Sequence, residues 1–225
     1  EPILSPDGRT LYFWRRLSPE NTAGVNDHGD IWFTIQLGSG DWAPAKRMGI
    51  PLNTPGHDFI WQVSEDGDTL WMTQVPQGPY GRRNPGLAYA TRSSYGGWNR
   101  PVPGRIEGLV SSGNCKDYFL TPEKILLLPN QGGDTYGASD LYVAFPVKQG
   151  MWSRPINLGP VINSYGDEDA PFLGADGKTL FFNSNGHGGL GDHDVFMSTR
   201  LDDSWTNWSE PVNLGAPVNT PGYDF

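Results

Sequence analysis

Apolar and polar positions along the chain repeat with a period of roughly 55 residues. Short apolar runs alternate with turns rich in Gly, Pro, Asn and Asp, and no segment shows the 3.6-residue period of an amphipathic helix. Similar turn segments mark the repeat, at Asn53–Gly56, Ser112–Gly113, Asn163–Gly166 and Asn219–Gly222. They divide the chain into four units, which we place approximately at residues 1–56, 57–113, 114–166 and 167–225.

Each unit is predicted to form four short antiparallel strands. Asp-Gly turns begin at Asp7, Asp66 and Asp176, and this dipeptide accepts the positive φ of a tight hairpin. The third unit lacks that turn, and we expect its hairpin at 121–125 to be two residues shorter, which keeps the same side chains toward the core. Later strands are predicted around Asp30–Trp32, Leu87–Tyr89, Asp140–Tyr142 and Asp194–Phe196, each followed by a tryptophan: Trp42, Trp98, Trp152 and Trp208.

Four such sheets predict an all-β fold, a four-bladed β-propeller in which each blade is a four-stranded antiparallel sheet. The C-terminal residues 219–225 followed by the N-terminal residues 1–8 regenerate the junction seen at 53–67, so we expect the ring to close between the two ends. Residues 1–225 would then be a single domain. The alternative is that the four blades belong to a six- or seven-bladed parent.

The composition and the net charge restrict the kinds of partner that the chain is expected to bind. The chain has 28 aromatic residues (Trp 9, Tyr 9, Phe 10), which predicts an ordered core despite Gly 30 and Pro 20. A net charge of −9 disfavours nucleic acid as a partner. Cys115 is the single cysteine, so an intrachain disulfide is excluded, and no apolar run is long enough for a membrane span. The first residue is Glu1 rather than Met, as expected after removal of a signal or trimming.

The four tryptophans, and the aspartates that begin the predicted third strands, recur at the same position of each repeat in which they occur. We therefore interpret them as residues that stabilise the fold. The tryptophans would fill the space between neighbouring blades. Asp30, Asp140 and Asp194 would accept hydrogen bonds from nearby backbone N–H groups.

The repeat resembles the TolB-type, WD-like propeller repeat of bacterial envelope proteins. The fourth unit carries the resemblance most completely, in Asp176–Phe182, Asp194–Phe196, Trp208–Gly215 and Val218–Gly222. The resemblance implies a periplasmic or outer-membrane-associated binding module whose partner is a glycan, a peptide or an envelope protein. The second unit departs from the pattern, with Trp61 where Pro2 and Pro171 stand.

Three carboxylates occupy equivalent places just before the first strand of a blade: Asp58, Glu168 and Asp224, with Cys115 at the fourth place. In a propeller these places open on one face near the axis. The carboxylates are therefore expected either to converge as a polar floor or a site for a divalent cation such as Ca²⁺, or to cap their own blades. The sequence requires no other cofactor.

Residues that break the repeat are expected on the same face. They would place aromatic rings and guanidinium groups around an acidic mouth, a combination suited to sugars or carboxylate-bearing ligands. The predicted ligand-binding residues, besides the three carboxylates, are Trp14, Arg15, Arg16, His57, Trp61, Arg82, Arg83 and Tyr223.

Two further motifs carry less weight. Residues 186–191 match G-x-G-x-x-G, but a strand follows them, whereas a dinucleotide site needs a helix there. His187, Asp192 and His193 form a His-and-acid cluster, which is a weak candidate for a metal site. No nucleophile elbow is present, and no catalytic residue is assigned.

The function we expect is therefore a non-catalytic binding module of the bacterial cell envelope, which recognises a glycan, peptide or protein segment. Two alternatives remain open. One is a polysaccharide lyase or glycoside hydrolase that acts on an acidic glycan at the same face, and the other is a structural spacer in an envelope assembly. The sequence leaves the oligomeric state undetermined.

Overall fold

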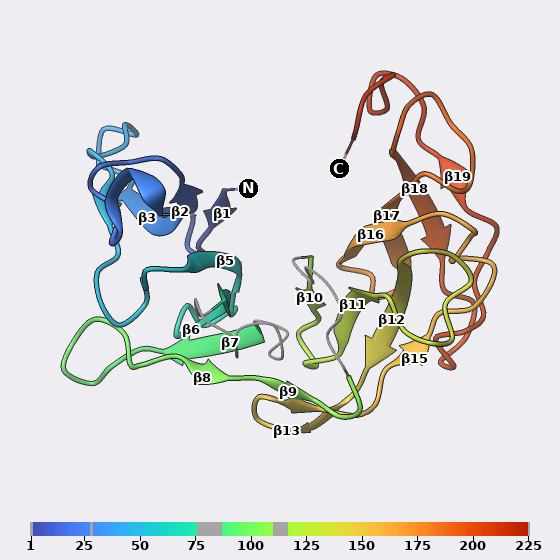
Figure 1. Ribbon diagram of the computed structural model, residues 1–225, viewed down its shortest axis with the longest axis horizontal. Helices are drawn as coiled ribbons and strands as arrows, with labels where there is room; N and C mark the ends of the chain where they lie inside the picture. Colours follow the sequence, from blue (N-terminus) through green and yellow to red (C-terminus); the bar gives the residue numbers. More distant parts are fainter. Residues whose placement is uncertain (1, 28, 76–86, 110–116, 225) are drawn as a thin grey trace. The chain divides into compact units, whose positions relative to one another are not determined.

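The computed structural model describes residues 2–27, 29–75, 87–109 and 117–224 (Figure 1). Strands and turns make up these residues, together with one 3-10 turn at Gly24–Asn26, and the described residues include no α-helix. The chain divides into two compact structural units, each larger than a sequence repeat: the first unit is Glu1–Arg105 and the second unit is Ile106–Phe225. The predicted all-β class is confirmed.

The first unit contains two four-stranded antiparallel sheets, each in simple sequential order. The strands of the first sheet are β1 (Ile3–Leu4), β2 (Thr10–Arg15), β3 (Asp30–Ile35) and β4 (Lys46–Arg47), and those of the second are β5 (His57–Val63), β6 (Thr69–Val75), β7 (Leu87–Thr91) and β8 (Val102–Pro103). Strand β5 packs against the first sheet, and buried side chains such as Ile31, Leu52 and Leu70 form their common core.

The second unit repeats this arrangement. One sheet contains β10 (Phe119–Leu120), β11 (Leu126–Asn130), β12 (Asp140–Ala144) and β15 (Ile156–Asn157), and the other contains β16 (Glu168–Leu173), β17 (Thr179–Ser184), β18 (Asp194–Thr199) and β19 (Val212–Asn213). A small sheet of β9 (Arg105–Ile106), β13 (Pro146–Lys148) and β14 (Met151–Trp152) accompanies them. Four strands per repeat are thus confirmed, whereas a closed ring of four blades in a single domain stays a prediction.

The predicted hairpins form at the Asp-Gly turns. Gly8, Gly67 and Gly177 have φ of 70°, 73° and 66°, values that glycine adopts without steric cost. In the third repeat Lys124, at φ 66°, takes the glycine's place. Leu120 pairs with Leu126 where Leu4 pairs with Leu11, so this hairpin is one residue shorter, and the predicted difference of two residues is wrong.

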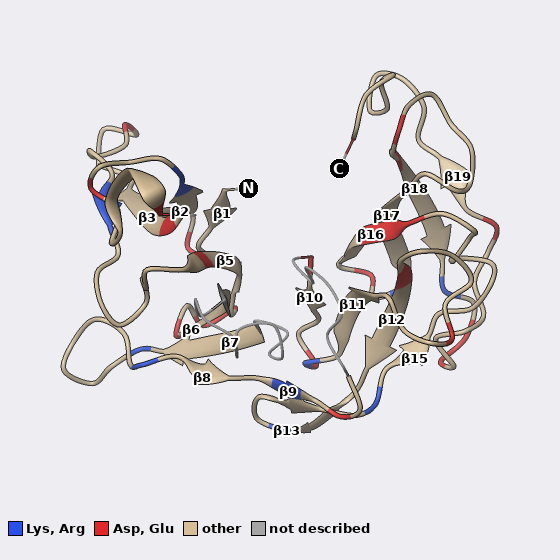
Figure 2. Cartoon of the chain, in the orientation of Figure 1, with Lys and Arg blue, Asp and Glu red and all other residues tan. Residues whose placement is uncertain are grey.

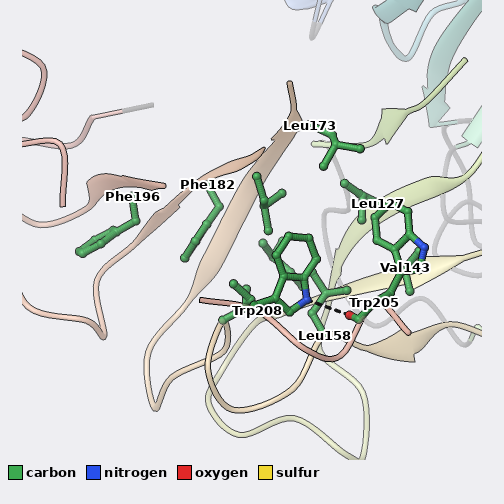
Figure 3. Close-up of a cluster of buried hydrophobic side chains, with 11 residues drawn as sticks. Leu127, Val143, Leu158, Leu173, Phe182, Phe196, Trp205 and Trp208 are labelled. Atoms are coloured by element: carbon green, nitrogen blue, oxygen red, sulfur yellow. Dashed lines mark hydrogen bonds between the residues drawn. The ribbon is translucent and has the colours of Figure 1, made fainter. Parts of the chain in front are cut away.

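The core cluster of the second unit contains Trp205 and Trp208, which follow the third strand of the last sheet (Figure 3). Trp208 is 3% exposed, and its indole N–H donates to the carbonyl of Trp205 at 2.8 Å. Trp152 is 2% exposed and donates to the carbonyl of Lys124. In the first unit Trp42 is 41% exposed, so the packing role predicted for all four tryptophans fails there.

Candidate functional site

Two of the turn segments that mark the repeat, Asn53–Gly56 and Asn163–Gly166, connect one sheet to the next within a unit, and Ser112–Gly113 lies outside the described residues. In three repeats the side-chain amide of the first asparagine brackets one backbone position on the third strand of the preceding sheet. Asn163, for example, accepts from the N–H of Leu141 at 2.7 Å and donates to its carbonyl at 3.0 Å. Asn53 does the same with Ile31, and Asn219 with Val195.

The three predicted carboxylates close the same turns. Asp58 accepts from the backbone N–H and the hydroxyl of Thr54, Glu168 from those of Ser164, and Asp224 from those of Thr220. Asp58 and Glu168 are fully buried. These contacts are those expected if each carboxylate caps its own blade. We therefore assign the three carboxylates to the scaffold and not to a ligand-binding site. Their convergence on one mouth would involve both units and stays a prediction.

The strand-entry aspartates have the predicted backbone contacts. Asp140 accepts from the N–H groups of Tyr136 and Gly137, and Asp194 from those of Leu190 and Gly191. Each of the two also accepts from a fourth-strand asparagine amide, Asn157 or Asn213. In the first repeat Asp30 accepts from the N–H of Thr22, and Arg47 stands in the asparagine's place at 3.2 Å.

The contacts above belong to the repeated scaffold. The side chains that differ between repeats lie where the second strand of one sheet ends, next to the segment that leads into the first strand of the following repeat. In the first unit Gly29 forms a parallel bridge with His57, beside Trp14. In the second unit His193 forms the equivalent bridge with Tyr223, beside Asn183. Because the backbone is shared and the side chains differ, these two corners are the candidate functional sites.

The corner of the first unit combines aromatic rings with exposed guanidinium groups. The rings of Trp14 and His57 meet edge to face at 5.5 Å, and His57 lies 5.3 Å from Phe59. The guanidinium of Arg16 lies 5.7 Å from the Trp14 ring. That of Arg15 lies 4.9 Å from the ring of Trp32. We call Trp14, Arg15, Arg16, His57 and Phe59 the aromatic–arginine corner. Such a surface can stack on an apolar ligand face and pair with a carboxylate.

A buried carboxylate, that of Asp58, directly follows His57 in the chain. Burial raises the pKa of Asp58 to about 7, and the carboxylates of Asp30 and Asp27 add to the effect. The hydrogen bonds from Thr54 oppose it. Near neutral pH Asp58 therefore exchanges between a neutral and a charged form next to His57.

The corner of the second unit is acidic instead. Asp169 faces Asn183 across β16 and β17, and the ring of Tyr223 lies 4.2 Å from that of His193. Figure 2 shows the contrast, with basic residues at the end of β2 and acidic residues on β16. We call Asp167, Asp169, Asn183, His193 and Tyr223 the acidic corner. Sequence reasoning missed Asp167, Asp169 and Asn183, although Asp169 breaks the repeat at the position of Phe59.

The remaining predicted residues are dispersed. Trp61 lies on β5 against Trp71, with ring centroids 5.9 Å apart. Arg82, Arg83 and Cys115 lie outside the described residues. The structure brings together Trp14, Arg15, Arg16 and His57, whereas Tyr223 belongs to the acidic corner.

The metal-site candidates have other contacts. The His187 imidazole lies 2.7 Å from the carbonyl oxygen of Ile162 and contacts the rings of Phe182 and Phe196. Asp192 is exposed, and His193 stacks on Tyr223. Across the described parts of the chain, no three His, Cys, Asp or Glu side chains are arranged to hold a metal ion.

Solved structures provide the comparison for the fold. The chain aligns with an α-L-arabinofuranosidase from Lactobacillus brevis over 97% of its length and 73% of the other chain, at 12% identity and a TM-score of 0.57. It aligns with a periplasmic gluconolactonase from Pseudomonas aeruginosa over 97% and 58%, at 15% identity and a TM-score of 0.53. These neighbours are β-propeller proteins. The propeller fold is supported.

A protein of unknown function from Dyadobacter fermentans has a similar structure, with a TM-score of 0.57 at 14% identity over 96% of this chain and 68% of that one. At such identities the similarity concerns the fold alone. The chain spans less than two thirds of several similar structures, 58% of the gluconolactonase and 41% of the Bacteroides ovatus xyloglucan GH43B. No family model and no curated protein matches the sequence.

Among the described residues, no helix is long and apolar enough to cross a lipid bilayer.

Proposed function

We propose that this chain is a propeller module that binds an anionic glycan at the aromatic–arginine corner. The observation that carries the proposal is the placement of both Arg16 and His57 beside the Trp14 indole, in a corner where the repeated scaffold requires neither. A sugar ring can stack on an exposed indole or imidazole face, and a guanidinium pairs with a uronate carboxylate in a bidentate manner.

The burial of Asp58 favours binding over catalysis at this corner. Glycoside cleavage commonly uses two carboxyl groups that both reach the substrate. Asp58 is fully buried and held by Thr54, so it does not reach a ligand on the far side of His57. Among the described residues of this corner, the groups available to a ligand are aromatic and cationic.

The enzymatic alternative, a hydrolase or lyase of an acidic glycan, draws on a different observation. The solved structures that share the fold include an α-L-arabinofuranosidase, although that activity belongs to the other protein. In the second unit, burial and the neighbouring Asp167 raise the pKa of the half-buried Asp169, as a general acid requires. Release of reducing ends from polygalacturonate or arabinan by the wild-type chain, abolished by Asp169→Asn, would favour this alternative.

Calorimetric titration tests the binding proposal. The wild-type chain should bind an oligogalacturonate and not the corresponding neutral galactan, and the Arg15→Ala/Arg16→Ala double variant should lose roughly tenfold or more in affinity. Arg9→Ala is the matched control, because Arg9 is an exposed arginine in the hairpin that precedes the same strand. Equal affinities for the double variant and the wild type would exclude the corner as the site.

An extracytoplasmic location in a bacterial envelope is part of the proposal, since it follows from the resemblance of the repeat to TolB-type propellers. Fractionation of cells that produce the full-length protein would test the location. A role as a structural spacer predicts instead that the Arg15→Ala/Arg16→Ala variant keeps every function of the wild type.

A further inference from the structure

We propose that the acidic corner of the second unit is a separate binding site for the primary ammonium group of an amino sugar. This inference goes beyond the proposed function, because it concerns different residues and a ligand of opposite charge. It rests on three features of the corner: its hydrogen-bond acceptors, an unpartnered buried amide oxygen and an exposed aromatic ring.

The first feature is the gathering of acceptors on one side of the inner strands. Asp169 and Asn183 are direct partners across β16 and β17, so their side chains lie on the same face of the sheet. Asp167, two residues earlier, lies on that face as well, and its charge acts on Asp169. Asp169 is half-buried and accepts a long hydrogen bond of 3.3 Å from the hydroxyl of Ser139.

The second feature is the side chain of Asn183, which is 2% exposed. Its amide nitrogen donates to the carbonyl oxygen of Asp224 at 3.3 Å and to the hydroxyl of Tyr223 at 3.4 Å. The carbonyl of Asp224 can only accept, so it fixes the orientation of the amide. The Asn183 Oδ1 atom is then buried without a hydrogen-bond partner among the described residues, as is Nδ1 of His193. Buried polar atoms are normally paired, so a missing donor is indicated.

The third feature is Tyr223, which touches both of these side chains. Its ring lies 4.2 Å from the His193 ring, and its hydroxyl contacts Asn183, yet the residue is 52% exposed. A rotation of this exposed side chain would open the two unpartnered atoms to a ligand. The ring itself offers an electron-rich face to a cation or to the apolar side of a sugar.

These features select the ligand chemistry. Two carboxylates and an amide oxygen can only accept hydrogen bonds, so the group that satisfies them must be a donor, and the two carboxylates favour a donor with positive charge. A primary ammonium carries three donors on a single charge. Burial and the charge of Asp167 raise the pKa of Asp169, and a bound cation would reverse that effect by stabilising the carboxylate. The aromatic ring and the polar surroundings favour an amino sugar over a simple amine.

The probe is a glucosamine trimer, titrated into the chain at about pH 6, where its amines are charged. The N-acetylated trimer is the matched ligand, because it keeps the sugar rings and lacks the charge. We expect the glucosamine trimer to bind, the acetylated trimer to bind at least roughly tenfold more weakly, and Asp169→Asn to weaken the glucosamine trimer to a similar degree. Asp169→Asn keeps the shape and removes a half-buried charge, so it should fold.

Glu210→Gln is the control variant, since Glu210 is an exposed acid beyond the opposite end of β18 and should leave binding unchanged. The inference is overturned if the glucosamine trimer does not bind, or if Asp169→Asn and Glu210→Gln bind it equally well. Tighter binding of a lysine tripeptide than of the trimer would overturn the choice of an amino sugar. Oligogalacturonate binding by Asp169→Asn separates the two proposals, because it should equal that of the wild type whichever way the trimer behaves.

Discussion

Gly29 lies directly against Trp14, and a Cβ atom at position 29 would approach Trp14 Cε3 to 2.8 Å. Gly29 also has φ 142°, which side-chain-bearing residues rarely adopt. The position of the indole in the aromatic–arginine corner therefore depends on the absence of a side chain at position 29.

Gly29→Ala should displace Trp14, weaken oligogalacturonate binding by roughly tenfold and lower the free energy of unfolding by about 2–3 kcal/mol. Gly24→Ala is the control, because Gly24 has φ 66° with no atom near its absent Cβ. It should be destabilised by backbone strain alone, about 1 kcal/mol, with normal binding. Calorimetry and chemical denaturation of both variants measure the difference, and equal binding by the two would show that the Trp14 contact is unimportant.

Asp58 predicts a dependence of stability on pH. Its pKa is about 7 in the folded chain, against a usual value of 3.8, so the folded state favours the protonated form. The stabilisation is fully present below about pH 4 and is lost as pH rises through about 7, a change of roughly 2–4 kcal/mol.

The measurement compares the wild type with Asp58→Asn by denaturation at several pH values. The variant keeps an acceptor for the N–H of Thr54 and cannot ionise. Relative to the variant, the wild type should lose stability between pH 4 and 7, and a constant difference over that range would contradict the predicted ionisation.

The ion pair between Arg47 and Asp30 predicts a substitution that can be rescued. Asp30 is fully buried, its Oδ1 atom has no hydrogen-bond partner in the part of the chain that the structure describes, and Arg47 is 36% exposed. Arg47→Ala should cost about 1–2 kcal/mol, because it removes the counter-charge from a buried carboxylate.

Arg47→Asn should recover most of that loss, because Asn157 and Asn213 bind the equivalent aspartates at 2.7 and 2.8 Å. Thermal unfolding of the two variants provides the test. If asparagine were no better than alanine, the correspondence between the repeats would not extend to this contact.

The asparagine bracket predicts a large effect from a small side chain. Asn163→Ala would leave the N–H of Leu141 buried without its partner, at a cost of about 1–3 kcal/mol, whereas the carbonyl of Leu141 would keep the N–H of Leu158. Asn207→Ala, on the exposed surface, should cost less than about 1 kcal/mol. Denaturant midpoints of the two variants would distinguish them, and a similar small loss in both would refute the structural importance of the bracket.

The strands and hairpins could be predicted because their signals are local. The Asp-Gly dipeptides at Asp7 and Asp176 predict turns from the sequence alone, and each aspartate accepts a hydrogen bond from a backbone N–H of its turn. The recurrence of Asp140 and Asp194 at one phase likewise identified backbone acceptors. The hairpin at Lys124 was misjudged, because its length depends on a register that sequence spacing did not fix.

The sites were harder to predict, since their residues meet through register and burial. Glu168 could be a ligand or a cap on sequence grounds, and only its contact with Ser164 decides between them. Asp169 and Asn183 meet only once β16 and β17 are aligned, across an irregularity that begins at Asp169. Trp42 and Trp152 share a phase but differ in exposure, because the phase does not reveal what covers each side chain.

The bracket also determines where the chain can be divided. The side-chain amide of Asn163 binds β12, a strand of the sheet that precedes it in the sequence. Glu168, five residues later, already belongs to β16 of the following sheet. A fragment that ends before Asn163 would lose the hydrogen bonds between the Asn163 side chain and the backbone of Leu141. Pieces designed for expression should therefore keep the whole turn at both borders, so that neighbouring fragments share these few residues.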